Sequence, residues 1–259
     1  MWRSTVALAA TLCLTLASGA LAGAPSHDLV VFEAASLKEA FAALAARFEN
    51  EHPGTHVVTN AAGSQELRAQ IEQGAAADVF ASADRRHMET LVAAGLASAP
   101  ALFACNEPVV VVRQDLAAIK TFADLPRAER IVVGAPEVPI GAYTVQILKQ
   151  AADKLGAPFA ARVQAKIVSR ELNVRQVLAK VVLGEADAGV VYRTDAQAAK
   201  GKVRVVEIPP ALNVTAAYPI AALKHAPNPD LAAAFVALVR SPSGVAVLRE
   251  AGFVACPAR

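Results

Sequence analysis

The chain has 259 residues, of which 55% are hydrophobic, 5% aromatic and 19% charged, and its formal net charge at pH 7 is +2. This length can bury one large core or two modest ones. Because the charge is nearly balanced and Lys and Arg do not form a stripe, the sequence lacks the electrostatic footprint of a nucleic-acid-binding protein, and we expect no nucleic-acid partner.

Residues 1–24 are typical of a Sec-type signal peptide. Arg3 precedes a short apolar run, and small residues follow it up to Ala22. This order predicts cleavage after Ala22 or Ala24. The apolar run is short for a membrane-spanning helix, and no later segment is long and apolar enough to span a bilayer. We therefore expect a soluble mature protein that is exported to the periplasm.

From Asp28 onward, short Val-rich runs alternate with segments of helical period. The predicted strands are residues 28–34, 55–61, 78–83, 108–113, 130–135, 165–169, 187–192 and 203–208. Three predicted helices carry apolar stripes: Leu37, Phe41, Leu44 and Phe48; Ile147, Leu148, Ala151 and Leu155; and Val174, Val177, Leu178, Val181 and Val182. This alternation predicts an α/β fold of parallel βαβ units in open, doubly wound sheets, which bind ligands at the carboxyl ends of their strands.

Two extended runs, residues 103–112 and 215–223, do not follow clearly from a helix. We interpret them as the places where the chain crosses into a second lobe and returns. The predicted division is then 25–104 plus 216–259 for the first lobe and 105–215 for the second.

Cys105 and Cys256 are the cysteines that remain once the signal peptide, which contains Cys13, is removed. Two cysteines in an oxidising compartment can pair. The alternative is a pair of buried free thiols, a common environment for cysteine. We expect a disulfide that ties the C-terminus to the middle of the chain, provided that the two Cα atoms come within bonding range.

Four junctions between a loop and a predicted helix are candidates for chemistry: Ser36, Ser64, residues 140–143, and Asn173 with Val174. Each presents backbone N–H groups at the positive end of a helix dipole, which together make an anion site without formal charge. Helix capping alone also explains each Ser or Asn. Both serines follow a strand and very small residues, which let a ligand approach the backbone, and this favours an anion site.

Enzymatic signatures are absent around the two serines. Neither Ser36 nor Ser64 lies in a G-x-S-x-G elbow, and the chain contains no phosphate-binding GxxxxGK[ST] loop or dinucleotide-binding fingerprint. His52 and His56 are four residues apart, but Pro53-Gly54 between them prevents a helix that would aim both at one metal. We therefore expect that the protein is not an enzyme, that it has no catalytic residue, and that no side chain binds a cation directly.

The segments AASLKEAF, GSQELRAQIEQGAAADVFASAD, VPIGAYTVQIL, NVRQVLAKVVLGEADAGVVYRTDA and YPIA occur in this order along the chain. Together they resemble the periplasmic molybdate-binding proteins of ABC transporters over nearly the whole mature chain. The resemblance implies two α/β lobes joined by a hinge, the type II periplasmic binding-protein arrangement, which hold a tetrahedral oxyanion between them.

The resemblance also implies which residues bind the oxyanion. Ser36 and Ser64 would supply hydroxyl and backbone donors from the first lobe. The second lobe would supply an amide at Ile140, the amide of Val174 and the hydroxyl of Tyr192. The family often has Pro-Ala-Gly where this chain has Pro-Ile-Gly, a change that keeps an amide donor. We expect Arg175, beside Val174, to point sideways into solvent.

By this resemblance the expected function is capture of molybdate, and of tungstate, and delivery to a membrane permease with a cytoplasmic ATPase. We expect a monomer without a cofactor, since the oxyanion is cargo. Three alternatives remain open at this point. The first is a receptor for another ligand, such as sulfate, phosphate, or ferric ion with a synergistic anion. The second is a secreted serine hydrolase that uses Ser36 or Ser64, and the third is a sensory or chaperone role for the same two-lobed fold.

Overall fold

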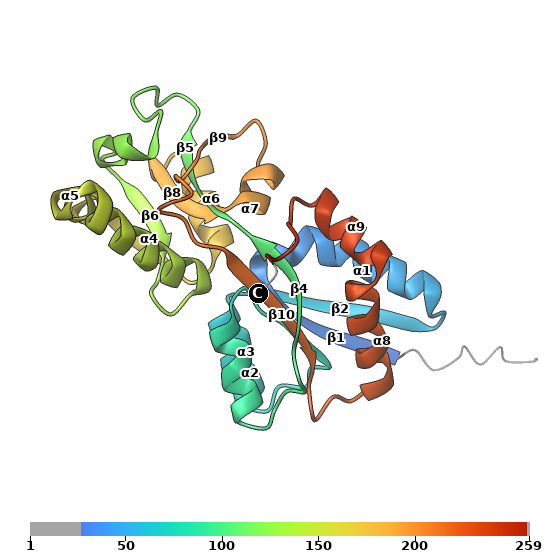
Figure 1. Cartoon of the computed structure of the whole chain (residues 1–259). Coiled ribbons are helices and arrows are strands. Elements are labelled where there is room, and N and C mark those ends of the chain that lie inside the picture. The colour runs from blue at the N-terminus through green and yellow to red at the C-terminus, as the bar shows by residue number, and fades with distance from the viewer. Residues whose placement is uncertain (1–26, 258–259) are drawn as a thin grey trace, which may run out of the picture.

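The computed structural model describes residues 27–257, which form two five-stranded mixed sheets with helices packed around them (Figure 1). The predicted signal peptide lies outside the described residues. The strands are β1 (His27–Ala34), β2 (Thr55–Ala62), β3 (Val79–Ala81), β4 (Ala101–Asn106), β5 (Pro108–Arg113), β6 (Ile131–Gly134), β7 (Ile167–Glu171), β8 (Ala188–Tyr192), β9 (Val203–Val206) and β10 (Ala216–Ala222). The helices are α1 (Lys38–Glu51), α2 (Ser64–Glu72), α3 (Arg85–Ala93), α4 (Pro139–Leu155), α5 (Ala157–Ala165), α6 (Val174–Val182), α7 (Arg193–Ala198), α8 (Pro229–Arg240) and α9 (Pro242–Glu250), with 3₁₀ turns η1 (Ala35–Leu37) and η2 (Phe122–Arg127).

The first sheet has the strand order β2-β1-β3-β10-β4 and is covered on both faces. Alternate side chains of β1 point to opposite faces, because successive residues of a strand alternate. Leu29 and Val31 join the core beneath α1 and α8, whereas Phe32 joins a second cluster beneath α2 and α3. Figure 1 shows α1, α8 and α9 on one side of this sheet and α2 and α3 on the other. The two-sided burial explains why the strands read as apolar runs.

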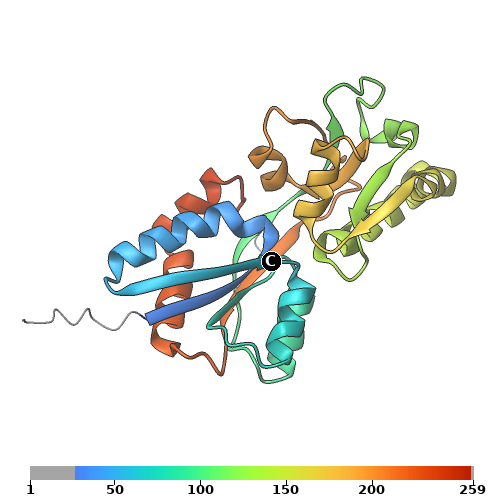
Figure 2. The same cartoon turned by 180° about the vertical axis from the view of Figure 1, so that it is seen from behind.

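The second sheet has the order β7-β6-β8-β5-β9. Its strand β6 lies between β7 and β8 and is parallel to both. The crossover β6-α4-α5-β7 and the crossover β7-α6-β8 run in opposite directions along the sheet. Their helices therefore lie on opposite faces, as right-handed connections require (Figure 2). The carboxyl ends of these strands and the N-termini of α4 and α6 therefore meet at one edge of the sheet.

The expectation of parallel sheets is wrong for the strands that carry the chain between the sheets. Only Glu107 separates β4 from β5, so β5 enters the second sheet without a crossover helix and pairs antiparallel with β8 and β9. The returning strand β10 is likewise antiparallel to β3 and β4. Both sheets are therefore mixed. The chain leaves the first sheet after Asn106, two residues beyond the predicted end of the first lobe, and the lobe division itself remains a proposal.

All eight predicted strands are present, with ends that lie within two residues of the predicted ones. The stripe on α1 is fully buried, and that on α6 is buried except for the half-buried Val182. The stripe on α4 is shorter than predicted, because Leu155 ends the helix and is 46% exposed. No single helix within residues 27–257 meets the length and hydropathy of a membrane span; α8 and α9 reach them only together, across a 63° bend.

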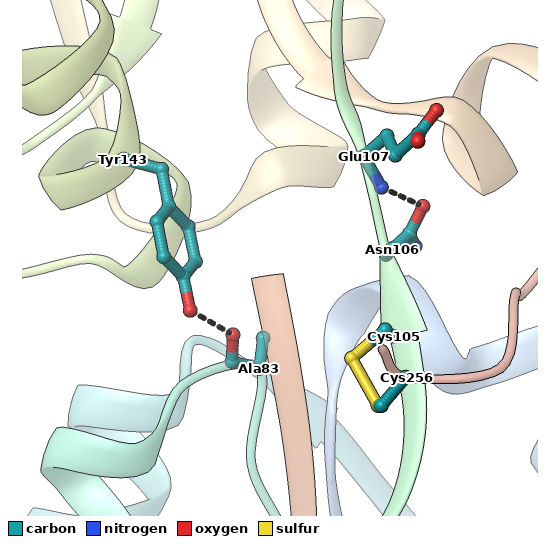
Figure 3. Close-up of a disulfide and its surroundings, with 6 residues drawn as sticks. All are labelled: Ala83, Cys105, Asn106, Glu107, Tyr143 and Cys256. Carbon is teal, nitrogen blue, oxygen red and sulfur yellow. Dashed lines mark hydrogen bonds between the residues drawn. A yellow bond between two sulfur atoms is a disulfide. The ribbon is translucent and has the colours of Figure 1, made fainter. Parts of the chain in front are cut away.

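Cys105 and Cys256 form a disulfide beside the passage from β4 to β5 (Figure 3). The segment before Cys256 lies along β4, where the backbone N–H of Cys105 donates to the Val254 carbonyl and the N–H of Val254 donates to the Cys105 carbonyl, each at 2.9 Å. The two cysteines are 151 positions apart in the sequence, with a Cα–Cα distance of 5.0 Å. The bond therefore anchors the C-terminal segment to the first sheet and closes a loop that contains the whole second sheet.

Candidate functional site

A cavity lies where the helix N-termini of the two sheets face each other. It is small: the centre of a water-sized sphere can occupy about 10 Å³ of it, roughly the space that one water molecule needs, so it suits a small ion or molecule. All five residues predicted to bind the oxyanion line it: Ser36, Ser64, Ile140, Val174 and Tyr192. The structure thus brings together residues that are up to 156 positions apart, while their role in binding remains a prediction.

Ser64 is the first residue of α2 and is 1% exposed. Ser64 was expected to cap α2 but does not. Gly63 occupies the cap position, and the Gly63 N–H donates to the Glu66 carboxylate at 3.0 Å. The Ser64 hydroxyl oxygen instead accepts the Ala83 N–H at 3.1 Å. A hydroxyl has one proton and two acceptor positions, so this bond orients the oxygen and leaves the Ser64 proton free to be donated.

Gly63 allows the two lobes to approach closely beside Ser64. A Cβ atom at position 63 would lie 2.4 Å from the Leu172 carbonyl oxygen of the second lobe, a distance that no side chain tolerates. The same carbonyl accepts a hydrogen bond of 2.6 Å from the Gln65 side chain. A glycine is therefore required here by the contact between lobes.

Ser36 lies in η1, immediately before α1, and is 3% exposed. Its hydroxyl oxygen is 2.9 Å from the hydroxyl of Tyr218 on β10. If the Tyr218 hydroxyl donates, Ser36 accepts that bond and can donate its own proton to a ligand in the cavity. The predicted donor therefore has a hydrogen-bonding partner of its own on the strand that returns from the second lobe.

The start of α4 contributes backbone amides. Pro139 is the first helical residue, and the first intrahelical bond runs from the Ala142 N–H to the Val138 carbonyl at 2.9 Å. The N–H groups of Ile140 and Gly141 precede that bond and have no intrahelical acceptor. The Ile140 side chain is 1% exposed and packs against Gly134 at the end of β6. Ile140 thus combines a buried side chain with an amide at the cavity.

The start of α6 also presents a free backbone amide to the cavity. Asn173 caps the helix, and its side chain accepts the Gln176 N–H at 3.1 Å. Val174 is the first helical residue, so its amide precedes the intrahelical bonds and belongs to the positive end of the helix dipole. Its side chain is 4% exposed and packs in the core, which holds the helix end against the cavity.

Tyr192 ends β8 and is 1% exposed. Its hydroxyl has no hydrogen-bond partner within residues 27–257, although buried hydroxyls are normally paired. Burial, with the nearby Tyr218, raises the pKa of Tyr192 well above its ordinary value, so the group keeps its proton and acts as a donor. An unpaired buried donor that lines a cavity indicates that an acceptor belongs there.

Charged side chains are absent from the described residues that line the cavity. Arg175, which follows the lining residue Val174 in the sequence, was expected to point into solvent but does not. Its side chain is 24% exposed; its Nε atom lies 2.9 Å from Asp195 Oδ1, and its guanidinium also pairs with Glu39. The physical reason is the fully buried Asp195 carboxylate, which requires a counter-charge inside the protein.

Sequence reasoning also missed the buried carboxylate of Glu33, near the end of β1. Glu33 is 0% exposed, and neither carboxylate oxygen has a hydrogen-bond partner among the described residues. Burial, with the Glu39 charge, raises its pKa to about 8, so Glu33 is mainly protonated and neutral at pH 7. It therefore adds little negative charge near Ser36. No local pattern marks it, because an acidic residue at a strand end is usually solvated.

The contacts between lobes were also not predicted from the sequence. The Glu137 carbonyl, just before α4, accepts hydrogen bonds from Arg86 at 2.7 Å and from His87 Nε2 at 2.9 Å. The Tyr143 hydroxyl donates to the Ala83 carbonyl at 3.4 Å (Figure 3). Together with the bond from Gln65, these contacts show that the described conformation is closed around the cavity.

The site has no group of three or more His, Cys, Asp or Glu side chains placed to hold a metal ion within residues 27–257. What it offers is a set of neutral donors: hydroxyls from both lobes and amides at helix N-termini. Such a set is suited to hold an anion by oriented dipoles.

The chain is similar to known proteins over most of its length. Residues 29–254 match the family described as bacterial extracellular solute-binding protein. The molybdate-binding protein ModA of Mycobacterium tuberculosis is 42% identical over 231 residues, which are 88% of this chain and 85% of that protein. The molybdate-binding protein ModA of Escherichia coli is 33% identical over 98% of this chain and 99% of its own length. The solved structure of the periplasmic molybdate-binding protein of Azotobacter vinelandii superposes with a TM-score of 0.77 at 25% identity, covering 88% of this chain and 100% of the other.

Proposed function

The chain belongs to the bacterial extracellular solute-binding proteins, and from this we propose that it captures molybdate between its two lobes and delivers it to the permease of an ABC transporter. The family and the similar proteins are transport proteins rather than enzymes. The observation that carries the proposal is the cavity itself, which both lobes line with neutral donors and which includes the unpaired hydroxyl of Tyr192.

Neutral donors are sufficient to hold an oxyanion in a closed site. Buried away from water, the anion loses its hydration shell, and oriented N–H and O–H groups replace that shell. The two helix N-termini of the second lobe add the positive ends of their dipoles. Binding therefore needs no arginine or lysine in contact with the anion.

The same donors select against hydrogen phosphate. A donor-only cavity suits an anion that carries no proton at neutral pH, such as molybdate, tungstate or sulfate. Hydrogen phosphate brings a proton that needs an acceptor, and leaving this proton unpaired in a buried site costs about 1–3 kcal/mol. No described carboxylate lines the cavity, and the nearby Glu33 has a pKa of about 8 and is itself mainly protonated at pH 7.

Closure of the lobes is the proposed capture step. Ser36 and Ser64 lie in the first lobe, whereas Ile140, Val174 and Tyr192 lie in the second, so all donors reach one anion only when the lobes are together. A ligand that contacts both lobes stabilises the closed form by this difference in affinity. We propose that the closed, monomeric protein then docks on the permease in the periplasm, after export by the segment 1–24.

Titration calorimetry on the ligand-stripped mature protein tests the proposal, with molybdate, tungstate, sulfate and phosphate in parallel. We expect one-to-one binding of molybdate and tungstate, much weaker binding of sulfate and no heat with phosphate. Ser64→Ala should weaken molybdate binding, whereas Ser98→Ala, a serine that does not line the cavity, is the matched control. Preferential binding of sulfate or phosphate would overturn molybdate as the ligand, and no heat with any anion would overturn the receptor.

A further inference from the structure

Arg175 connects the two lobes outside the cavity. It is the second residue of α6, next to Val174, and it extends from the second lobe to the first. There its Nε donates to the Ala35 carbonyl at 3.2 Å, and its guanidinium pairs with the Glu39 carboxylate. Its partner within the second lobe is Asp195, at 2.9 Å.

Two of the three partners of Arg175 are connected to a predicted donor. Ala35 directly precedes Ser36. Asp195 accepts the backbone N–H of Tyr192 through its other carboxylate oxygen, at 3.1 Å. One guanidinium therefore ties together three chain segments that carry donors, two from the second lobe and one from the first.

These contacts differ in what happens when the lobes separate. The pair with Asp195 lies within the second lobe and survives opening, and because Asp195 is 0% exposed it holds the guanidinium in place. The contacts with Ala35 and Glu39 cross between the lobes and exist only in the closed form. The single Nε hydrogen of Arg175 goes to Ala35, so the contact with Asp195 Oδ1 is an ion pair without a hydrogen bond. The planar guanidinium can face all three partners at once, which a lysine ammonium cannot match in geometry.

We propose that Arg175, held by Asp195, is a positioning residue that latches the closed form through Ala35 and Glu39 without touching the ligand. The latch rests on the proposed capture of an oxyanion by closure. Its contribution appears in ligand affinity, because only the closed form is stabilised, and specifically in the rate at which bound ligand leaves.

The latch is tested by a double-mutant cycle of Glu39→Gln and Arg175→Gln, with molybdate as the probe in calorimetry and stopped-flow dissociation. Glu39 is 53% exposed, so we expect Glu39→Gln to weaken affinity about 2- to 5-fold through faster dissociation. Arg175→Gln loses both crossing contacts and should weaken affinity more, about 5- to 50-fold. Adding Glu39→Gln to Arg175→Gln should then have no further effect.

Glu51→Gln is the matched control, because Glu51 also lies on α1 and forms an exposed ion pair, but with Arg47 of the same lobe. It should leave affinity and dissociation unchanged. If Arg175→Gln does not fold, the dissociation rate of Glu39→Gln alone still tests the latch, because Glu39 is exposed and its replacement should not prevent folding. The latch alone is overturned by either of two results, provided that the wild type binds molybdate. In the first, Glu39→Gln releases molybdate at the wild-type rate. In the second, the two substitutions act additively. A wild-type protein that does not bind overturns the proposed function and the latch with it.

Discussion

Replacement of Tyr192 by Phe should change ligand affinity and stability in opposite directions. The Tyr192 hydroxyl is buried without a hydrogen-bond partner among the described residues. An unsatisfied buried polar group costs about 1–3 kcal/mol, so its removal should leave the ligand-free protein as stable as the wild type or more stable by up to this amount. The ring stays in place, because Phe keeps the packing against Tyr143 and Tyr218, whose ring centroids lie 6.4 and 5.7 Å away.

Ligand affinity should fall in the same variant. A hydrogen bond to a charged group contributes about 1.5–3 kcal/mol, so Tyr192→Phe should weaken molybdate binding about 10- to 100-fold. Calorimetric titration measures the affinity, and thermal unfolding of the ligand-free protein measures the stability, with about 2–4 °C expected for each kcal/mol. A Tyr192→Phe variant that binds molybdate as tightly as the wild type would refute the reasoning.

Ser64→Ala provides the contrast that separates the two effects. Because the Ser64 oxygen accepts the buried Ala83 N–H, its removal orphans that amide as well as removing a donor to the ligand. This variant should therefore lose stability and affinity together, each by about 1–3 kcal/mol. Equal stability of Ser64→Ala and the wild type would show that the Ala83 bond does not hold the serine.

Three further outcomes follow from the structure. Reduction of the Cys105–Cys256 disulfide should lower the unfolding temperature, because the bond closes a loop of about 150 residues. For such a loop, chain entropy alone predicts a stabilisation of up to about 5 kcal/mol. The control is a Cys105→Ser, Cys256→Ser variant, which should be insensitive to reductant, and an unchanged wild-type unfolding temperature under reductant would contradict the prediction. The pKa of Glu33 is raised from 4.5 to about 8, so the stability that its protonated form contributes is full below pH 4.5 and lost as the pH rises to about 8. Glu33→Gln should therefore gain stability relative to the wild type across this range, by up to about 1.4 kcal/mol per pH unit in chemical denaturation, and a difference that does not change with pH contradicts the raised pKa. Gly141→Ala should lower both stability and affinity, since its Cβ would lie 1.9 Å from the Ala135 carbonyl and force the start of α4 away from β6; unchanged thermal unfolding and titration would contradict this.

The order of strands and helices was predictable because it depends on local pattern. Val-rich runs such as residues 108–113 and the stripe from Leu37 to Phe48 record burial directly, so both appear where expected. The position of the cavity was predictable for the same reason, since a strand followed by a small-residue turn and a helix places an N-terminus at the sheet edge. The roles of the lining residues came from the family resemblance and await measurement.

Features that depend on long-range contacts could not be predicted in this way. The antiparallel direction of β5 and β10 follows from how the chain passes between sheets, which no local period records. Arg175 was expected to be solvated, but tertiary packing pairs it with Asp195, 20 positions away in the same lobe, and with Glu39 of the other lobe. Gly63 displaced Ser64 from the cap by a single residue, a shift within the uncertainty of any helix boundary.

The most direct test of the central claim is a crystal structure of the mature protein with molybdate, in which anomalous scattering locates the molybdenum atom. We predict a single ion in the cavity between the lobes. Its oxygens should lie about 2.6–3.2 Å from the hydroxyls of Ser36, Ser64 and Tyr192 and from the amides of Ile140 and Val174, with no charged side chain in contact. Molybdenum located elsewhere, or held by Arg or Lys side chains, would contradict capture by neutral donors.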